Sequence, residues 1–167
     1  PDEDLKEFLG RLVNAESGTK VFIFGSVFGG TGASSIPVLP PALRDAVAIA
    51  CGGVKLNAHF GSTLLTNYFS FPASSERQKN EEKVIAESVY FDLNSQAAMD
   101  FYSKDKSVKE FYKRFYMVGW PEEAADWGTK DGILKTGGSD QKNPCHVAEL
   151  MCAAAAYDFF KKDTVLD

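Results

Sequence analysis

A glycine-rich stretch from Gly25 to Ser35 has the residue types that a phosphate-binding turn needs. Glycines leave out the side chains that would keep a ligand away from backbone N–H groups, and they permit positive φ. Where a helix begins, its first N–H groups are unpaired and carry a partial positive charge, which attracts anions. Thr31 could also donate a hydroxyl hydrogen bond to a phosphate oxygen. We therefore predict a phosphate-binding turn made by Gly25, Ser26, Gly29, Gly30, Thr31, Gly32, Ala33 and Ser34.

The same stretch has a plainer interpretation, which is a tight turn whose glycines serve only close packing of a helix. Two common phosphate motifs fit it poorly. The Walker motif requires Gly-Lys-Ser/Thr, and this stretch contains no lysine. The dinucleotide fingerprint G-x-G-x-x-G is partly met, since Ser35 stands at its last glycine and residues 54–57 offer no acidic group for a ribose. A Rossmann-like dinucleotide-binding oxidoreductase module stays open as an alternative.

The elements on either side of the turn are a strand and a helix. Residues 20–24 are an apolar, β-branched and aromatic run, which is typical of a strand buried on both faces of a parallel sheet. Ser34 or Ser35 could cap the following helix, and Pro37 fits its first turn. Pro40 and Pro41 indicate a start near Leu39 or a distorted first turn, so the helix is expected to be regular from 42 to 50.

The remaining pattern alternates between helices and strands. We expect an amphipathic helix over 2–15, a strand over 62–69, a helix over 81–103 and a strand over 115–119. The last helix, over 144–160, is apolar nearly all round, which predicts that it is buried in a core. This alternation predicts one α/β domain over 1–167, with three layers and a mainly parallel, Rossmann-like sheet flanked by helices.

Composition limits the classes of function. The net charge is −5 and no long basic run occurs, which argues against binding to nucleic acid. Three cysteines without paired spacing favour reduced thiols, and no membrane-length apolar stretch or signal peptide is seen. These features predict a cytoplasmic protein with no membrane partner. Because the chain starts at Pro1 without a methionine, we expect a fragment of a longer or processed chain.

The segment from Phe28 to Ser34, after the strand at 21–24, resembles the G-G-G-T-G-[ST]-G motif of the tubulin/FtsZ superfamily. Phe28 stands at the first glycine of that motif and Ser34 at the last. In the family this loop wraps the phosphates of GTP, and the resemblance therefore implies GTP, with Mg²⁺, as the ligand. It also implies that Asn143, just before the last helix, contacts the guanine base, and that the chain associates with itself.

The resemblance implies GTPase activity as well, but two parts of the family's site are not found in this sequence. The family's first strand and phosphate loop are expected before residue 1. The family's acidic catalytic loop has N-x-D-x-x-[DE] spacing, which Asp158, Asp163 and Asp167 do not reproduce. No catalytic residue is assigned, and an assembly domain that keeps the fold but has lost its ligand is a further alternative.

Other residues with chemical potential have a plainer explanation. Cys145 and His146 are adjacent on a helix and point about 100° apart, which is poor geometry for a nucleophile and its base. His146 and Glu149 lie one turn apart, yet two ligands make a poor metal site, so no metal ligand is assigned. Three aromatic residues near the third strand could stack on a base, although core packing explains them equally well: Tyr116, Trp120 and Trp127.

Overall fold

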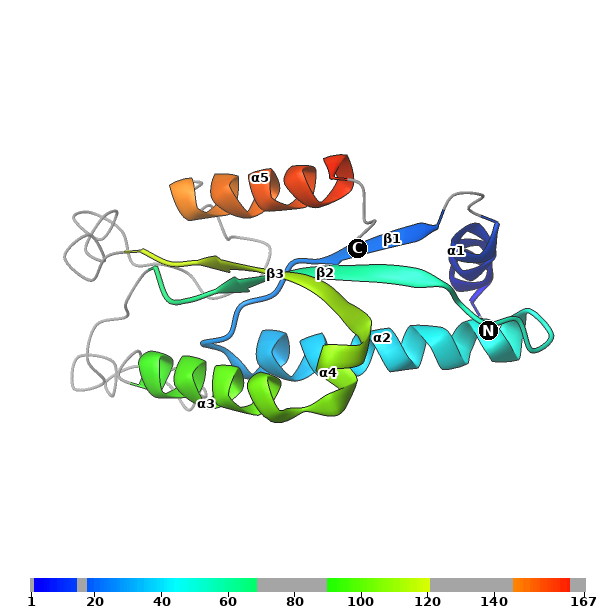
Figure 1. Ribbon diagram of the computed structural model, residues 1–167. Helices are drawn as coiled ribbons and strands as arrows, with labels where there is room; N and C mark the ends of the chain where they lie inside the picture. Colours follow the sequence, from blue (N-terminus) through cyan, green and yellow to red (C-terminus); the bar gives the residue numbers. More distant parts are fainter. Residues whose placement is uncertain (1, 15–17, 69–89, 121–145, 163–167) are drawn as a thin grey trace, which may run out of the picture.

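The computed structural model describes residues 2–14, 18–68, 90–120 and 146–162. In these residues three parallel strands form one sheet in the order β1-β2-β3, and helices cover both of its faces (Figure 1). The strands are β1 (Thr19–Ile23), β2 (Ala58–Leu65) and β3 (Tyr112–Val118). The helices are α1 (Glu3–Val13), α2 (Gly30–Ala50), α3 (Phe91–Lys104), α4 (Lys106–Phe111) and α5 (Val147–Lys161). The predicted α/β class with a parallel sheet is confirmed.

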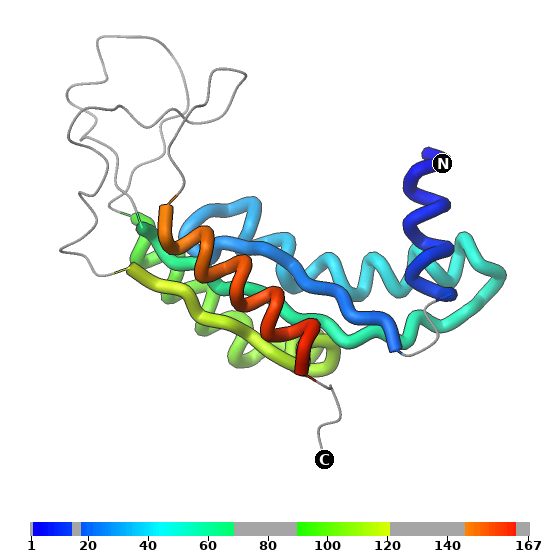
Figure 2. The backbone as a smooth tube through the Cα atoms, turned by 90° about the horizontal axis from the view of Figure 1, so that it is seen from above, coloured from blue at the N-terminus to red at the C-terminus, as the bar shows by residue number. Residues whose placement is uncertain are grey.

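The three layers are α5, the sheet, and the pair α2 and α3. Seen from above, α5 lies across the strands, whereas α1 lies near the end where β1 and β2 begin (Figure 2). All three strands end at the same edge of the sheet, and the chain leaves β1 at this edge to enter α2 (Figure 1). Ligands of open α/β sheets bind outside this edge, where the strands have their carboxyl ends.

Register and side-chain alternation divide the core between the two faces of the sheet. Phe60 and Leu64 of β2 point toward α2 and α3, where they pack with Val27 and Ile36. Gly61 points toward α5, and a Cβ atom built on it would lie 2.8 Å from the Phe159 ring. Glycine at this position therefore allows α5 to approach the sheet closely.

Helix α2 begins much earlier than the prolines suggested. It starts at Gly30 and continues through Pro37, Pro40 and Pro41, so the expected late or distorted start is wrong. A proline inside a helix has no N–H, and the carbonyl four residues before it loses its usual hydrogen-bond donor. The helix can pass through these prolines at low cost only where another group supplies the missing donor.

Two tyrosine hydroxyls supply that donor for Pro37 and Pro40. Tyr102 of α3 donates to the carbonyl oxygen of Ala33, four residues before Pro37, at 2.5 Å. Tyr112 of β3 donates to the carbonyl oxygen of Ile36, four residues before the next proline, also at 2.5 Å. Burial raises the pKa of Tyr102 to about 12, and burial together with the nearby Tyr102 raises the pKa of Tyr112 as well. Both hydroxyls stay protonated and act as donors at neutral pH.

Several other boundaries differ from the expectations. The strand expected over 62–69 is β2, four residues earlier, and the strand expected over 115–119 begins at Tyr112. The helix expected over 81–103 is described only from Phe91, because residues 69–89 lie outside the described part. A short helix, α4, was not predicted.

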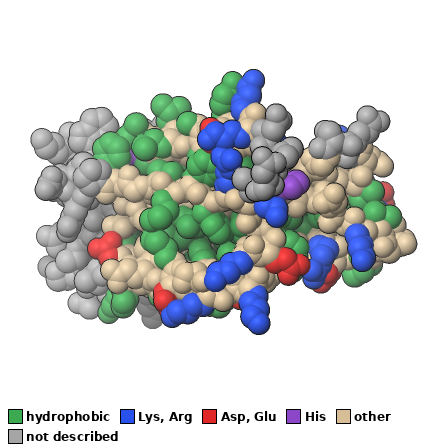
Figure 3. Space-filling view, viewed as in Figure 1, with side chains coloured by type: hydrophobic (Ala, Val, Ile, Leu, Met, Phe, Trp, Pro, Cys, Tyr) green, Lys and Arg blue, Asp and Glu red, His purple; other side chains and the backbone are tan. Residues whose placement is uncertain are grey.

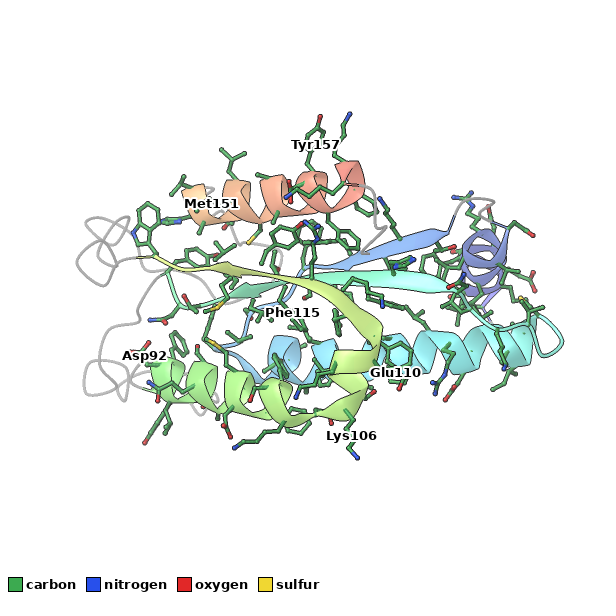
Figure 4. All side chains as sticks on the ribbon, viewed as in Figure 1. Asp92, Lys106, Glu110, Phe115, Met151 and Tyr157 are labelled. Carbon is green, nitrogen blue, oxygen red and sulfur yellow. The ribbon has the colours of Figure 1, made fainter. Side chains whose placement is uncertain are left out.

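The expectation that the last helix is wholly buried is also wrong. The face of α5 toward the sheet is buried, but its outer face is exposed to solvent, and Tyr157 points away from the sheet (Figure 4). An apolar sequence around a helix does not say how many of its sides the rest of the chain covers. The exposed apolar residues of α5 are Val147, Leu150, Met151, Tyr157 and Phe160.

Candidate functional site

Backbone hydrogen bonds join the glycine-rich turn to the sheet, where β1 and β2 have their carboxyl ends. The N–H of Val27 donates to the carbonyl of Leu65 at 2.9 Å, and the N–H of Leu65 donates to the carbonyl of Gly25 at 3.1 Å. The Thr63 hydroxyl accepts from the N–H of Gly25 at 3.0 Å. Ser26 also forms a parallel bridge with Leu65. The start of the turn is thus a continuation of the sheet, with a defined position at its edge.

Close packing explains two of the glycines in the turn. A Cβ atom on Gly32 would lie 2.3 Å from the carbonyl oxygen of Ser26 and 2.8 Å from its nitrogen, which no side chain can tolerate. A Cβ atom on Gly25 would lie 2.7 Å from the side chain of Ile36. The plainer interpretation of the turn, that glycines permit close approach, therefore holds at these two positions.

Gly30 is different, because no described atom lies within 4 Å of the position that its Cβ would take. The positive-φ glycines of the described residues are Gly18, Gly52 and Gly53, so the conformation of Gly30 does not require glycine either. Gly30 is exposed to solvent, as is Thr31 beside it. Neither packing nor backbone geometry in the described part of the chain explains a glycine here.

The N-terminus of α2 presents unpaired N–H groups to solvent. Gly29 is the N-cap residue, with extended backbone, and within the described residues no side chain caps this end of the helix. The first turn also contains no acidic residue. No carboxylate of the turn therefore neutralises the partial positive charge of the helix terminus. The terminus lies at the end of the sheet where the strands have their carboxyl ends.

The two serines expected to cap the helix lie inside it instead. The hydroxyl groups of Ser34 and Ser35 donate to the carbonyl of Thr31, at 3.2 Å and 2.6 Å. This arrangement follows from the early start of α2 at Gly30, since it places both serines in the helix rather than before it. Ala33 lies in the first turn as well, and its N–H already donates to the carbonyl of Gly29 at 3.1 Å. Ala33 and Ser34 lie next to the predicted anion position, but their described bonds are intrahelical.

Helix α3 supports the other side of the turn, a contact that the sequence analysis did not predict. The Asn94 side chain donates from Nδ2 to the carbonyl of Phe28 at 3.1 Å. The Phe28 ring packs on Phe91, with 5.0 Å between ring centroids. Phe28 thus has a packing role in the turn. No local sequence signal connects Asn94 with a turn 66 residues before it.

A second group of side chains gathers at the ends of β2 and β3. The rings of Tyr68 and Trp120 pack on the His146 imidazole, with centroid distances of 4.9 Å and 4.6 Å. His146 is the N-cap residue of α5, and its Nδ1 accepts from the N–H of Ala148 at 3.1 Å. Glu149 accepts a hydrogen bond from the Tyr68 hydroxyl at 3.1 Å. In this cluster His146 caps α5 and packs against two aromatic rings.

Two of the remaining residues, Tyr116 and Asp158, lie together away from this edge. Tyr116 points to the α5 face, where its hydroxyl donates to Asp158 at 2.8 Å. Asp158 also pairs with Lys162 at 2.8 Å, and hydrogen bonds from Lys162 and Tyr116 lower the pKa of its carboxyl group. Asp158 is therefore engaged within α5 and β3. Five other residues named in the sequence analysis lie outside the described residues: Trp127, Asn143, Cys145, Asp163 and Asp167.

The described residues lack two further features. They contain no group of three or more His, Cys, Asp or Glu side chains placed to hold a metal ion. None of their helices is both long and apolar enough to cross a membrane. Comparison with protein-family models, curated proteins and solved structures found no match for this chain.

Proposed function

We propose that this chain binds the phosphate groups of a nucleotide at the N-terminus of α2. The observation that carries the proposal is Gly30, an exposed glycine at an uncapped helix terminus that neither packing nor backbone conformation requires. A phosphate oxygen in contact with backbone N–H groups explains the missing side chain, because a Cβ atom would occupy the space that the anion needs. The Thr31 and Ser26 hydroxyls are the further donors of this site.

GTP is the nucleotide that we propose, on the resemblance of Phe28 to Ser34 to the tubulin/FtsZ motif. The base is expected at the same edge of the sheet, beyond the ends of β2 and β3. Tyr68 and Trp120 offer aromatic faces there, and Asn143 is the base contact that the resemblance implies. Mg²⁺ would be bound mainly by the phosphates and water, as is usual for this ion.

The proposal is limited to binding. A hydrolytic step needs a group that positions or deprotonates water, and Asp158, the described candidate, is engaged by Lys162 and Tyr116. We therefore assign no catalytic residue, and self-association remains a proposal that rests on the resemblance alone.

The variant Gly30→Asp separates binding from folding. An aspartate at the start of a helix interacts favourably with the helix dipole, so folding should be unchanged or slightly stabilised, by about 0.3–1 kcal/mol. The same carboxylate would repel a phosphate about 5 Å away by roughly 3 kcal/mol per unit charge at an effective dielectric constant of about 20. Binding should weaken at least a hundredfold, at ~1.4 kcal/mol per tenfold. Ala42→Asp adds the same charge to an exposed position of α2 about 18 Å further along, and is the matched control.

The experiment is thermal unfolding with GTP, ATP, NAD or NADP, together with saturation-transfer NMR. GTP at a hundredfold excess over its Kd should add about 2.7 kcal/mol of stability to the unchanged protein and to Ala42→Asp, but no more than about 0.4 kcal/mol to Gly30→Asp, whose Kd should be at least a hundredfold higher. A response only to NAD or NADP would favour the dinucleotide-binding alternative. No response to any of the four would favour the assembly domain without a ligand. Equal GTP binding by Gly30→Asp would refute the site itself.

A further inference from the structure

An apolar groove lies along β3, on the face of the sheet that α3 and α4 cover. It encloses about 450 Å³ and is lined mainly by Leu64, Met99, Tyr102, Phe115 and Met117. Figure 3, which views the molecule from the side with α5 above the sheet and α3 below it, shows apolar side chains gathered in the middle and Lys, Arg, Asp and Glu side chains below them. Phe115 and Met117 remain 36% and 66% exposed, which is unusual for large apolar side chains on neighbouring positions of one strand face.

The floor of this groove is rigid. The Phe115 ring stacks on Tyr112 and on Tyr102, with centroid distances of 4.6 Å and 6.3 Å. Both tyrosine hydroxyls are held by carbonyl groups of α2. In Figure 4, Phe115 lies on the side of the sheet toward α3. A ligand would therefore meet a preformed surface and would not have to order these side chains on binding.

The groove is bordered by the open main-chain edge of β3. In the described residues β3 is the outer strand of the sheet, with β2 on one side only. The N–H of Thr66 donates to the carbonyl of Val118 at 2.9 Å, so the main-chain groups of Val118 and Tyr116 face β2. In a parallel ladder alternate residues face opposite sides, and Phe115 and Met117 therefore direct their N–H and C=O groups outward. The same two residues contribute side chains to the groove.

The charged side chain among those that line the groove, Lys109, is basic, although the chain as a whole carries a net charge of −5. Residues 104–114 include five basic and two acidic side chains. Lys109 lines the groove, and Lys106 of α4 and Lys113 of β3 are further exposed lysines on the two elements that border it. No carboxylate of the described residues forms an ion pair with these three lysines. An acidic group brought to Lys109 would gain attraction without displacing an existing partner.

We propose that the β3 groove binds an extended, apolar segment with acidic residues at one end, supplied by another protein, which adds to the sheet as a strand beside β3. Its backbone would pair with the outward groups of Phe115 and Met117, and alternate side chains would enter the groove. Its acidic residues would lie near Lys109. The groove is partly open to solvent and is bordered by a strand edge, which suits a peptide better than a small molecule, since small ligands are mostly enclosed.

The test uses labelled peptides and fluorescence anisotropy. The probes are seven-residue peptides, the length of β3, with two aspartates at one end followed by alternating valine and threonine. One probe has the aspartates at its amino end and the other at its carboxyl end, because a strand can add in either direction. A peptide with lysines in place of the aspartates is the charge control.

One of the two acidic peptides should bind with a Kd below about 100 µM, and the lysine peptide should bind at least tenfold more weakly. Met117→Lys should weaken binding at least tenfold, whereas Ile49→Lys, at an exposed apolar position of α2, should not. Lys109→Glu should weaken it about tenfold, whereas Lys55→Glu, on the exposed loop after α2, should not. All four changes are at exposed side chains, and thermal unfolding of each variant checks the fold.

Amide hydrogen exchange gives the position of the bound peptide, since the N–H groups of Phe115 and Met117 should become protected. Several results would overturn the proposal. These are no binding at about 1 mM peptide, equal binding of the lysine peptide, or equal losses in the control variants. Binding of dodecanoate without binding of either acidic peptide would assign the groove to a small amphiphile. A dimer that forms with rising concentration and disappears in Met117→Lys would assign it to a second copy of this chain.

Discussion

Removing one hydroxyl group, in Tyr102→Phe, tests how α2 passes through its prolines. The phenyl ring keeps its contacts in the core, where Tyr102 is 5% exposed, and only the hydrogen bond to the Ala33 carbonyl is lost. Pro37 cannot replace that donor. A buried acceptor left without a partner costs about 1–3 kcal/mol of stability. At roughly 2–4 °C per kcal/mol for a chain of this size, the Tm should fall by several degrees.

The assay is urea unfolding followed by circular dichroism, carried out as a double-mutant cycle with Pro37→Ala. An alanine at position 37 has an N–H that can donate to the Ala33 carbonyl. In a protein that carries Pro37→Ala, Tyr102→Phe should therefore lower the free energy of unfolding by no more than about 0.5 kcal/mol. Tyr157→Phe, at an exposed position of α5, is the matched control and should change stability by less than about 0.5 kcal/mol. Equal losses from Tyr102→Phe with and without Pro37→Ala would refute the reasoning, because Tyr102 would then stabilise the fold through other contacts.

Alkaline pH should destabilise the protein through the same tyrosine. The pKa of Tyr102 is about 12 in the folded protein, against an ordinary value of 10. The contribution of Tyr102 to the free energy of unfolding is therefore intact below pH 10 and is lost as the pH rises toward 12. Urea unfolding at several pH values should show that the free energy of unfolding falls less steeply with pH in Tyr102→Phe than in the unchanged protein. Gly32→Ala should lower the free energy of unfolding by at least about 2 kcal/mol, because the new Cβ atom would lie 2.3 Å from the Ser26 carbonyl oxygen. Gly30→Ala should instead raise it by about 0.5–1 kcal/mol. A similar Tm for the two variants would contradict the assigned packing. Gly61→Ala should lower the free energy of unfolding by about 1–3 kcal/mol, since the new Cβ atom would lie 2.8 Å from the Phe159 ring of α5. An unchanged unfolding midpoint would show that α5 is free to shift.

Features that depend on neighbouring residues were predictable from the sequence. The run at 20–24 is a strand, the glycines after it form a turn into a helix, and the alternation of elements gives a parallel sheet. Periodicity and glycine content are local properties, and they act through short-range geometry. The glycine-rich turn into α2 was located in the same way, and its binding of phosphate is a proposal.

The exact position of β2 was not predictable, because a strand is placed by its partners. The buried hydroxyl groups of Ser62 and Thr63 bond to backbone groups of the β1 segment, Ile23 and Gly25. These polar residues therefore lie inside the strand, whereas sequence alone put them at its start. The pairing of Thr19 with Ala58 then determines where β2 begins.

The sequence by itself determined the order of the elements and the glycine-rich turn, since both follow from contacts between residues close along the chain. Only the tertiary structure decided that α2 begins at Gly30, because the donors that replace the N–H groups missing at two of its three prolines come from Tyr102 and Tyr112, 69 and 76 residues away from their acceptors. That early start puts an uncapped, exposed helix terminus at the carboxyl edge of the sheet, and so it also creates the candidate site. Hydrogen bonds between distant segments leave no periodic signal in a sequence, and for this reason the length of α2 had to be seen in the folded chain.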